Sequence, residues 1–152
     1  MSLSTEPNRR AMPGGREPVV VNQRKPLIMN VDDDLQCRRF AKDVIERAGY
    51  GFVGASSGSE CLTLLHLVYP RIILLDIMMP EMDGYETCRR VRLNFPMVRS
   101  RIIYLSALNS LEDISRALGT DADDYVVKPF DPARLRERIQ HWLREGPRPT
   151  DL

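Results

Sequence analysis

The chain has 152 residues, of which 43% are hydrophobic, so it can form one domain with a sizeable core and has room for terminal tails. Its 22 basic and 21 acidic residues leave a net charge of +1, which gives no overall attraction to nucleic acid or to anionic membranes. No apolar run approaches the roughly 18 residues that a membrane span needs, and no signal-peptide core follows the N-terminal arginines. We therefore expect a cytoplasmic protein that binds neither a membrane nor, directly, nucleic acid.

The two ends of the chain lack hydrophobic periodicity. Residues 1–25 mix Pro, Gly, Ser, Asn and Arg, which predicts a flexible N-terminal tail, with a basic docking arm as the alternative. The C-terminal EGPRPTDL contains a Gly-Pro stop, so residues 146–152 are expected to form a tail or the start of a truncated linker. Residues 26–145 remain as a single folded domain. The three cysteines lack CxxC spacing and are expected to be reduced.

Two hydrophobic periods alternate along residues 26–145. Apolar runs rich in Ile, Leu and Val predict five strands, at 26–31, 50–56, 71–76, 101–106 and 124–128. Apolar residues at helical spacing predict five helices, with apolar stripes at 37–48, 61–68, 85–91, 111–118 and 135–143. This alternation predicts an α/β fold with a doubly wound, five-stranded parallel sheet and helices on both faces. The strands are continuous apolar runs, as strands buried on both faces should be.

Polar side chains follow four of the predicted strands, at the edge where open parallel sheets bind ligands. They are Asp32, Asp33 and Asp34 after the first strand, Asp76 ending the third, Ser106 ending the fourth and Lys128 ending the fifth. Ending a buried strand on a carboxylate costs free energy unless the charge is used. Gathered carboxylates suit an oxygen-preferring cation such as Mg²⁺. With a hydroxyl and an ammonium group they suit a phosphoryl group, and an aspartate can itself be the nucleophile.

Four motifs in this order resemble the receiver domain of two-component response regulators, the CheY-like family. They are VDDD at 31–34, LLDIMMPEMDG at 74–84, LSA at 105–107 and DDYVVKPF at 123–130. The resemblance covers about residues 25–145 and implies the flavodoxin-like strand order 2-1-3-4-5. It also implies a phosphorylation-switched signalling module that receives its phosphoryl group from a histidine kinase or a phosphotransfer protein. Such a module is not an enzyme in the ordinary sense, because it catalyses only its own phosphorylation and dephosphorylation.

The resemblance implies a role for each matched acidic residue. Asp76 matches the phosphoacceptor and is also a Mg²⁺ ligand. Asp33 matches the direct metal ligand, Asp32 its partner that acts through a water, and the backbone carbonyl of Met78 the third protein ligand. Asp34 is expected to start the first helix rather than to bind metal.

The resemblance also implies how the phosphoryl group is held and sensed. Ser106 and Lys128 match the hydroxyl and the ammonium that contact the phosphoryl oxygens, and the Lys128–Pro129 peptide is expected to be cis. Tyr125 matches the aromatic residue that switches together with Ser106. Their movement would change the surface formed by helix 111–118, strand 124–128 and helix 135–143, which is expected to serve partner binding or a homodimer.

An alternative function is a phosphatase-like enzyme with an aspartate nucleophile. Such an enzyme would place a second acid two residues after the nucleophile to protonate the leaving group. Met78 occupies that position and has no proton to give.

Two residues that flank the site, Met78 and Leu108, stand where many relatives carry polar residues, which predicts slow self-dephosphorylation. Asp121 stands where the family usually has glycine after the fourth helix; either aspartate, which tolerates a positive φ angle better than most residues, adopts that conformation, or Gly119 provides the helix cap instead.

Overall fold

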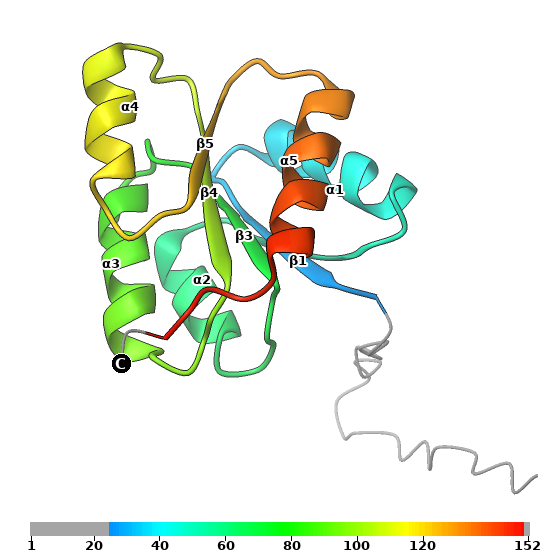
Figure 1. Ribbon diagram of the computed structural model, residues 1–152. Helices are drawn as coiled ribbons and strands as arrows, with labels where there is room; N and C mark the ends of the chain where they lie inside the picture. Colours follow the sequence, from blue (N-terminus) through cyan, green and yellow to red (C-terminus); the bar gives the residue numbers. More distant parts are fainter. Residues whose placement is uncertain (1–24, 151–152) are drawn as a thin grey trace, which may run out of the picture.

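The structure is a computed structural model that describes residues 25–150 (Figure 1). The N-terminal tail predicted over residues 1–25 lies outside the described residues except for Lys25. Residues 151 and 152 of the predicted C-terminal tail also lie outside them. Within residues 25–150, no helix is long and apolar enough to cross a lipid bilayer.

Within residues 25–150, five strands alternate with five helices, which confirms every predicted element and their order. The strands are β1 (Leu27–Val31), β2 (Gly51–Ala55), β3 (Ile72–Leu75), β4 (Arg101–Ser106) and β5 (Asp124–Val127). The helices are α1 (Leu35–Arg47), α2 (Gly58–Leu64), α3 (Gly84–Asn94), α4 (Leu111–Leu118) and α5 (Pro132–Glu145). All neighbouring strands are parallel, and their order β2-β1-β3-β4-β5 is the predicted one.

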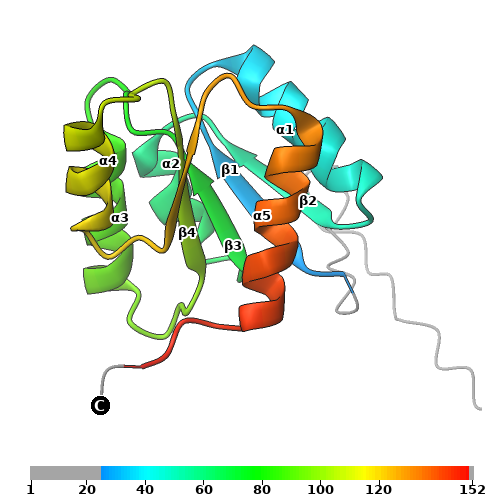
Figure 2. The ribbon, with the colours of Figure 1, turned by 45° about the horizontal axis from the view of Figure 1, so that its top comes forward.

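The sheet forms the middle of three layers, because helices cover both of its faces. Helices α1 and α5 lie on one face, and α2, α3 and α4 lie on the other (Figures 1 and 2). Successive residues of a strand point to opposite faces, so Ile28 packs among residues of α1 and α5 while Met29 packs among residues of α2 and α3. Fully burying one such side chain is worth about 1.5–3 kcal/mol, and the two apolar clusters together hold the layers in place.

Each helix begins at a side chain that caps its backbone N–H groups. The capping residues are Asp34, Ser57, Asp83, Ser110 and Asp131. The Oδ1 atom of Asp34 accepts hydrogen bonds from the backbone nitrogens of Gln36, at 2.7 Å, and Cys37, at 3.2 Å. This confirms that Asp34 starts the first helix. Such a cap typically stabilises a helix by about 1 kcal/mol, and here it fixes where the chain turns after β1.

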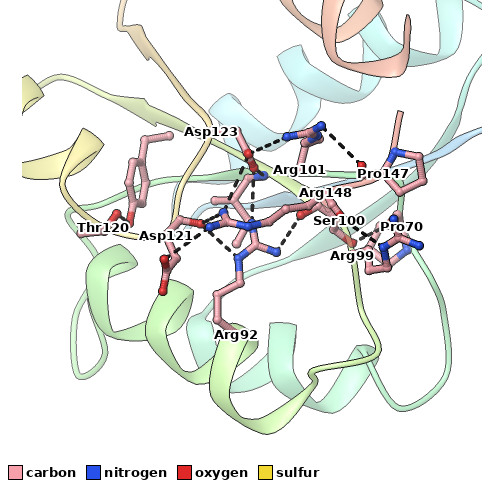
Figure 3. Close-up of polar contacts among 12 residues, drawn as sticks. Pro70, Arg92, Arg99, Ser100, Arg101, Thr120, Asp121, Asp123, Pro147 and Arg148 are labelled. Carbon is pink, nitrogen blue, oxygen red and sulfur yellow. Dashed lines mark hydrogen bonds and ion pairs between the residues drawn. The ribbon is translucent and has the colours of Figure 1, made fainter. Parts of the chain in front are cut away.

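A cluster of arginines and aspartates joins the amino end of β4 to neighbouring segments (Figure 3). The side chain of Asp123 is only 8% exposed, and its oxygens lie 3.3 Å from Arg92 and 3.0 Å from Arg101. The same carboxylate accepts the backbone N–H of Ile102 at 2.9 Å. This buried carboxylate therefore ties α3 and β4 to the segment that enters β5.

Residues 146–150 lie against this cluster. The backbone nitrogen of Arg148 donates to the carbonyl of Arg99 at 2.9 Å, and Figure 3 shows these two residues side by side. The Nε atom of Arg101 donates to the carbonyl of Gly146 at 2.9 Å. The Arg148 guanidinium contacts the backbone carbonyl and the carboxylate of Asp121. The first part of the predicted tail therefore packs on the folded domain.

The turn that contains Asp121 is accommodated without a left-handed backbone. Within residues 25–150, positive φ angles occur at Glu81, Gly49 and Gly146. Gly119 provides the C-cap of α4 with φ of −78°, and Asp121 instead offers its carbonyl to Arg92 at 3.0 Å. The aspartate at the usual glycine position thus serves the arginine cluster.

Candidate functional site

The predicted site residues come together at the carboxyl end of the sheet. Asp32 follows β1, Asp76 follows β3, Ser106 ends β4 and Lys128 follows β5, and these four strands are neighbours in the sheet. After β1 the chain continues to β2 on one side of the sheet, and after β3 it continues to β4 on the other side. Asp32 and Asp76 therefore flank the switch point of the topology. Ligand sites in open α/β sheets lie at such a point.

Three carboxylates converge there. Asp32, Asp33 and Asp76 each offer one oxygen, and these oxygens lie within 4.8 Å of one another. Asp32 and Asp76 are buried, whereas Asp33 is exposed. Backbone hydrogen bonds across the sheet fix the two buried residues, because Asp76 N donates to Val31 O at 2.9 Å and Asp32 N to Ala55 O at 3.0 Å.

This set of oxygen ligands fits Mg²⁺, which prefers carboxylates and keeps several waters. The exposed side of Asp33 leaves room for such waters. The role of the Met78 backbone carbonyl as a further metal ligand stays a prediction. The Met78 side chain is 61% exposed and points away from the core.

Lys128 connects two of the carboxylates. Its Nζ atom lies 2.5 Å from Oδ2 of Asp32 and 3.7 Å from Oδ2 of Asp76. Its backbone nitrogen donates to the carbonyl of Ser106 at 2.8 Å, which holds the residue beside the end of β4. The Lys128–Pro129 peptide is cis, as predicted.

The electrostatics of the site follow from burial and from this pairing. Burial raises the pKa of Asp76 to about 6, with the charge of Lys128 opposing the rise and that of Asp32 adding to it. Burial acts against the charged form of Lys128, but the hydrogen bond to Asp32 and the charge of Asp76 raise its pKa overall. At neutral pH Asp76 is thus mostly ionised, and Lys128 carries its positive charge.

The two predicted switch residues are both attached to the backbone of Leu108. Ser106 is fully buried, and its Oγ accepts a long hydrogen bond, 3.4 Å, from Leu108 N. Tyr125 is buried, and its hydroxyl donates to Leu108 O at 2.6 Å. The tyrosine ring therefore lies inward in this structure, with its centroid 6.2 Å from that of Tyr104.

A close backbone approach explains the glycine that ends the LLDIMMPEMDG motif. Gly84 N donates to Ile77 O at 2.8 Å, and a Cβ atom at position 84 would lie 2.3 Å from the carbonyl oxygen of Asp76. Only glycine permits this approach, which fixes the loop that follows Asp76. Met78 and Leu108 border a depression of about 490 Å³ beside this loop.

Two residues next to the site, Asn30 and Cys37, have no role among those predicted from the sequence. Asn30 lies within the apolar run PLIMNV and is 1% exposed. Cys37 lies in the first turn of α1 near Lys128, and burial raises the pKa of its thiol. A polar residue inside an otherwise apolar strand was the available signal for Asn30, whereas Cys37 fits the apolar stripe of its helix and gave none.

A doubly wound sheet with an acidic cluster, a hydroxyl and a lysine at its carboxyl edge defines an α/β domain of the receiver type. The chain belongs to the response regulator receiver domain family, which it matches over residues 28–140. Residues 28–140 therefore form a signalling domain of two-component systems.

Curated and solved relatives agree with this assignment. A probable transcriptional regulator, ycf27, of Cyanophora paradoxa is 40% identical over 130 residues, which cover 86% of this chain and 52% of that protein. The receiver domain of the Francisella response regulator 1452 has a TM-score of 0.74 and 30% identity, covering 80% of this chain and 98% of that one. A BeF3-activated DrrB receiver domain has a TM-score of 0.71 and 28% identity, with coverage of 79% and 98%.

The chain spans about half the length of the curated relatives that it matches. Histidine kinases are the partners of the receiver family, which agrees with the expected kind of partner. The matched relatives include proteins named as transcriptional regulators, and those proteins are about twice as long as the matched region. The expectation that the protein does not directly contact nucleic acid stays a prediction, and the names of these relatives do not favour it.

Proposed function

We propose that Asp76 accepts a phosphoryl group from the phosphohistidine of a histidine kinase or of a phosphotransfer protein. The observation that carries this proposal is the placement of the Asp76 carboxylate, 3.7 Å from the Lys128 ammonium and within 4.8 Å of oxygens of Asp32 and Asp33. The match to the receiver family and the BeF3-activated relative support the same chemistry.

In the proposed transfer, an oxygen of the ionised Asp76 attacks phosphorus and forms the new P–O bond. The P–N bond of the phosphohistidine breaks, and its electron pair leaves with the imidazole. Lys128 is placed to balance negative charge on the phosphoryl oxygens, and Ser106 to donate a hydrogen bond to them. Asp32, Asp33 and Asp76 would hold Mg²⁺, whose charge would offset that of the phosphoryl group.

The signal would leave the site through Ser106 and Tyr125. A hydrogen bond from Ser106 to a phosphoryl oxygen would move the loop at Leu108, to which both residues are attached. Helix α4 follows that loop and buries only Ala117 among its residues, while Leu111 is 86% exposed. An element held by so little packing can shift at low cost, so we expect the α4–β5–α5 surface to change and to bind a partner or a second copy.

The test is phosphorylation with acetyl phosphate, or binding of beryllofluoride, in the presence of Mg²⁺. Wild type should gain one phosphate that hydroxylamine removes, as expected of an acyl phosphate, and Asp76→Asn should gain none. Asp34→Asn is the matched control, because it makes the same chemical change two residues from Asp32 and asparagine also caps helices well. Labelling that persists in Asp76→Asn would refute the assignment of the phosphoacceptor.

Beryllofluoride also tests the route of the signal. Amide chemical shifts of residues 107–145 should change when it binds, and the changes should include the loop at Leu108. Binding that leaves these residues unperturbed would show that phosphorylation is sensed elsewhere.

The alternative of a phosphatase-like enzyme receives no support from the site. Position 78, where such enzymes place their general acid, carries an exposed methionine. Repeated turnover of phosphate monoesters by the wild-type protein would reverse this conclusion.

A further inference from the structure

A pocket of about 360 Å³ lies beside the amino end of β4, at the opposite end of the sheet from the candidate phosphoacceptor site. Its walls come from α3 and the connection to β4, from the turn between α4 and β5, and from residues 148–150. The side chains of Arg92, Arg99 and Arg148 line it together with Asp121 (Figure 3). Three guanidinium groups therefore share one small concave surface.

Backbone carbonyl groups hold these guanidinium groups in place. The Nε atom of Arg92 donates to the carbonyl of Asp121 at 3.0 Å, and its Nη1 atom donates to the carbonyl of Ser100 at 2.7 Å. The Nε atom of Arg99 donates to the carbonyl of Arg148 at 2.8 Å, and the Arg148 guanidinium donates to the carbonyl of Asp121. A carbonyl has no net charge, so these bonds orient the arginines without neutralising them.

Positive charge is in excess around the pocket. Asp123 is shared by three arginines at distances from 3.0 to 3.8 Å, and the exposed carboxylate of Asp121 pairs with Arg148 at 3.3 Å. Arg99 forms no ion pair within residues 25–150. Burial, together with the charge of Arg148, lowers the pKa of Arg92. Two carboxylates thus face four guanidinium groups, and an anion that enters would offset the difference.

Some N–H groups in the wall are left for such an anion. Among residues 25–150, the Nη1 and Nη2 atoms of Arg99 and the Nε atom of Arg148 have no hydrogen-bond partner in the protein. The Arg99 side chain is exposed, and that of Arg148 is 25% exposed. Guanidinium groups bind the oxygens of phosphate well, and a phosphate monoester carries about two negative charges at pH 7. Its charge therefore matches the excess of two positive charges.

The rest of the wall is apolar. Pro96 and Val98 line the pocket on the side of the α3–β4 connection, and Pro149 lines it on the side of the C-terminal segment. The volume of about 360 Å³ is several times what a phosphate group fills. A pocket of a few hundred Å³ with apolar walls and a few fixed polar groups is the usual form of a small-molecule site.

We propose that this pocket binds a phosphate monoester whose organic part is small and apolar. The phosphate group pairs with Arg99 and Arg148, and the organic part packs against Pro96, Val98 and Pro149. The ligand joins residues 148–150 to the α3–β4 connection. This site is separate from Asp76, so its occupancy does not depend on phosphorylation of that residue.

Three probes test the proposal by amide chemical shifts of the full chain in EDTA at pH 7.5 and constant ionic strength. Phenyl phosphate carries both the charged and the apolar part, inorganic phosphate lacks the ring, and phenol lacks the phosphate. Phenyl phosphate should give saturable shifts at Val98, Arg99 and Arg148, with at least fivefold tighter binding than either of the other two probes. Equal affinity for inorganic phosphate would overturn the proposed ester and leave a site for the inorganic ion alone.

Arg99→Gln should weaken phenyl phosphate binding at least fivefold. This substitution keeps the backbone hydrogen bonds of residue 99 with Tyr69 and Arg148, so the fold is spared. Arg39→Gln is the matched control, because it removes the same charge from an exposed position on α1 and should leave binding unchanged. Asp76→Asn should also bind as wild type does, which separates this test from that of phosphoryl transfer.

Three results would overturn the proposal. The first is the lack of saturable shifts around the pocket with phenyl phosphate. The second is an equal loss of affinity in Arg99→Gln and Arg39→Gln, which would show attraction to overall charge rather than to a site. The third is a set of shifts confined to the surroundings of Asp76, which would place the anion at the other end of the sheet.

Discussion

Lys128 lies closer to Asp32 than to Asp76, with Nζ–Oδ2 distances of 2.5 Å and 3.7 Å. The lysine thus pairs first with a carboxylate on the expected metal side of the site and only second with the expected phosphoacceptor. A cation that binds the carboxylates would compete with Lys128 for Asp32. The lysine would then be free to turn toward Asp76 and a phosphoryl group attached to it.

Mg²⁺ should stabilise the folded protein. Carboxylates of Asp32, Asp33 and Asp76 repel one another, and a metal that binds only the folded state stabilises it, by about 2.7 kcal/mol at 100 times its dissociation constant. Thermal melts in millimolar MgCl₂ should show a higher midpoint than melts in NaCl of equal ionic strength. The rise should disappear in Asp33→Ala and remain in Asp34→Asn. A wild-type midpoint that Mg²⁺ leaves unchanged would contradict the metal site.

Removal of the Lys128 ammonium should destabilise the metal-free protein. Lys128→Met leaves the buried carboxylate of Asp32 without its partner, and breaking a buried ion pair in this way costs about 3–5 kcal/mol. Urea denaturation in EDTA measures this loss, and Mg²⁺ should restore more stability to the variant than to wild type. Lys42→Met is the control, because Lys42 forms only an exposed pair with Glu46 and should lose less than about 1 kcal/mol. Equal losses in the two variants would show that the buried ion pair contributes no more to the free energy of unfolding than the exposed one.

The buried carboxylate of Asp76 should make stability depend on pH. Its pKa is raised from 3.8 to about 6, so between these values the folded state binds more protons than the unfolded state. Stability therefore falls as pH rises from about 4 to about 6, and the ionised group costs at most about 3 kcal/mol above that range. In EDTA, Asp76→Asn should be more stable than wild type at pH 7.5, and the difference should vanish near pH 4. Urea denaturation gives the unfolding free energy of each protein at each pH. A difference between the two proteins that stays constant from pH 4 to 8 would exclude the raised pKa.

Phosphorylated Asp76 should lose its phosphate slowly. Hydrolysis needs a water in line with the bond to the carboxylate, and Met78 and Leu108, which border the depression beside the loop after Asp76, offer that water no polar side chain. Met78→Asn combined with Leu108→Glu should hasten decay about tenfold, or roughly 1.4 kcal/mol of barrier. Ser106 and Tyr125 use only backbone atoms of Leu108, so the substitution spares those hydrogen bonds. Decay of labelled phosphate in Mg²⁺ after removal of the donor gives the rate, and an unchanged rate would rule out this control of the water.

The arginine and aspartate cluster at the amino end of β4 should contribute strongly to stability. Asp123→Ala leaves Arg92 and Arg101, whose side chains are each 12% exposed, without their shared carboxylate, and should cost about 3–5 kcal/mol. Asp121→Ala is the matched control, because that carboxylate is 69% exposed and the substitution keeps the carbonyl that Arg92 uses. Urea denaturation should show a loss below about 1 kcal/mol for the control. Similar losses for the two variants would argue against a special role for the buried carboxylate.

The sequence by itself determined the elements and the members of the site. Alternating strand and helix periods fix five strands and five helices, because each apolar residue must face a core wherever its element packs. Parallel strands share one carboxyl edge, so Asp32, Asp76, Ser106 and Lys128 had to meet there once the strand order was known. Local sequence also fixed the start of α1, since Asp34 caps the helix that directly follows it.

Tertiary structure alone decided which of these groups touch. The preference of Lys128 for Asp32 and the packing of residues 146–150 on the start of β4 join segments far apart in the chain. The orientation of Asn30 depends on a carbonyl of β3, 44 residues away. Such contacts depend on side-chain rotamers and on ångström-scale spacing between packed layers. A hydrophobic pattern sets which face of an element is buried, but it carries no information about distances between polar atoms on different elements.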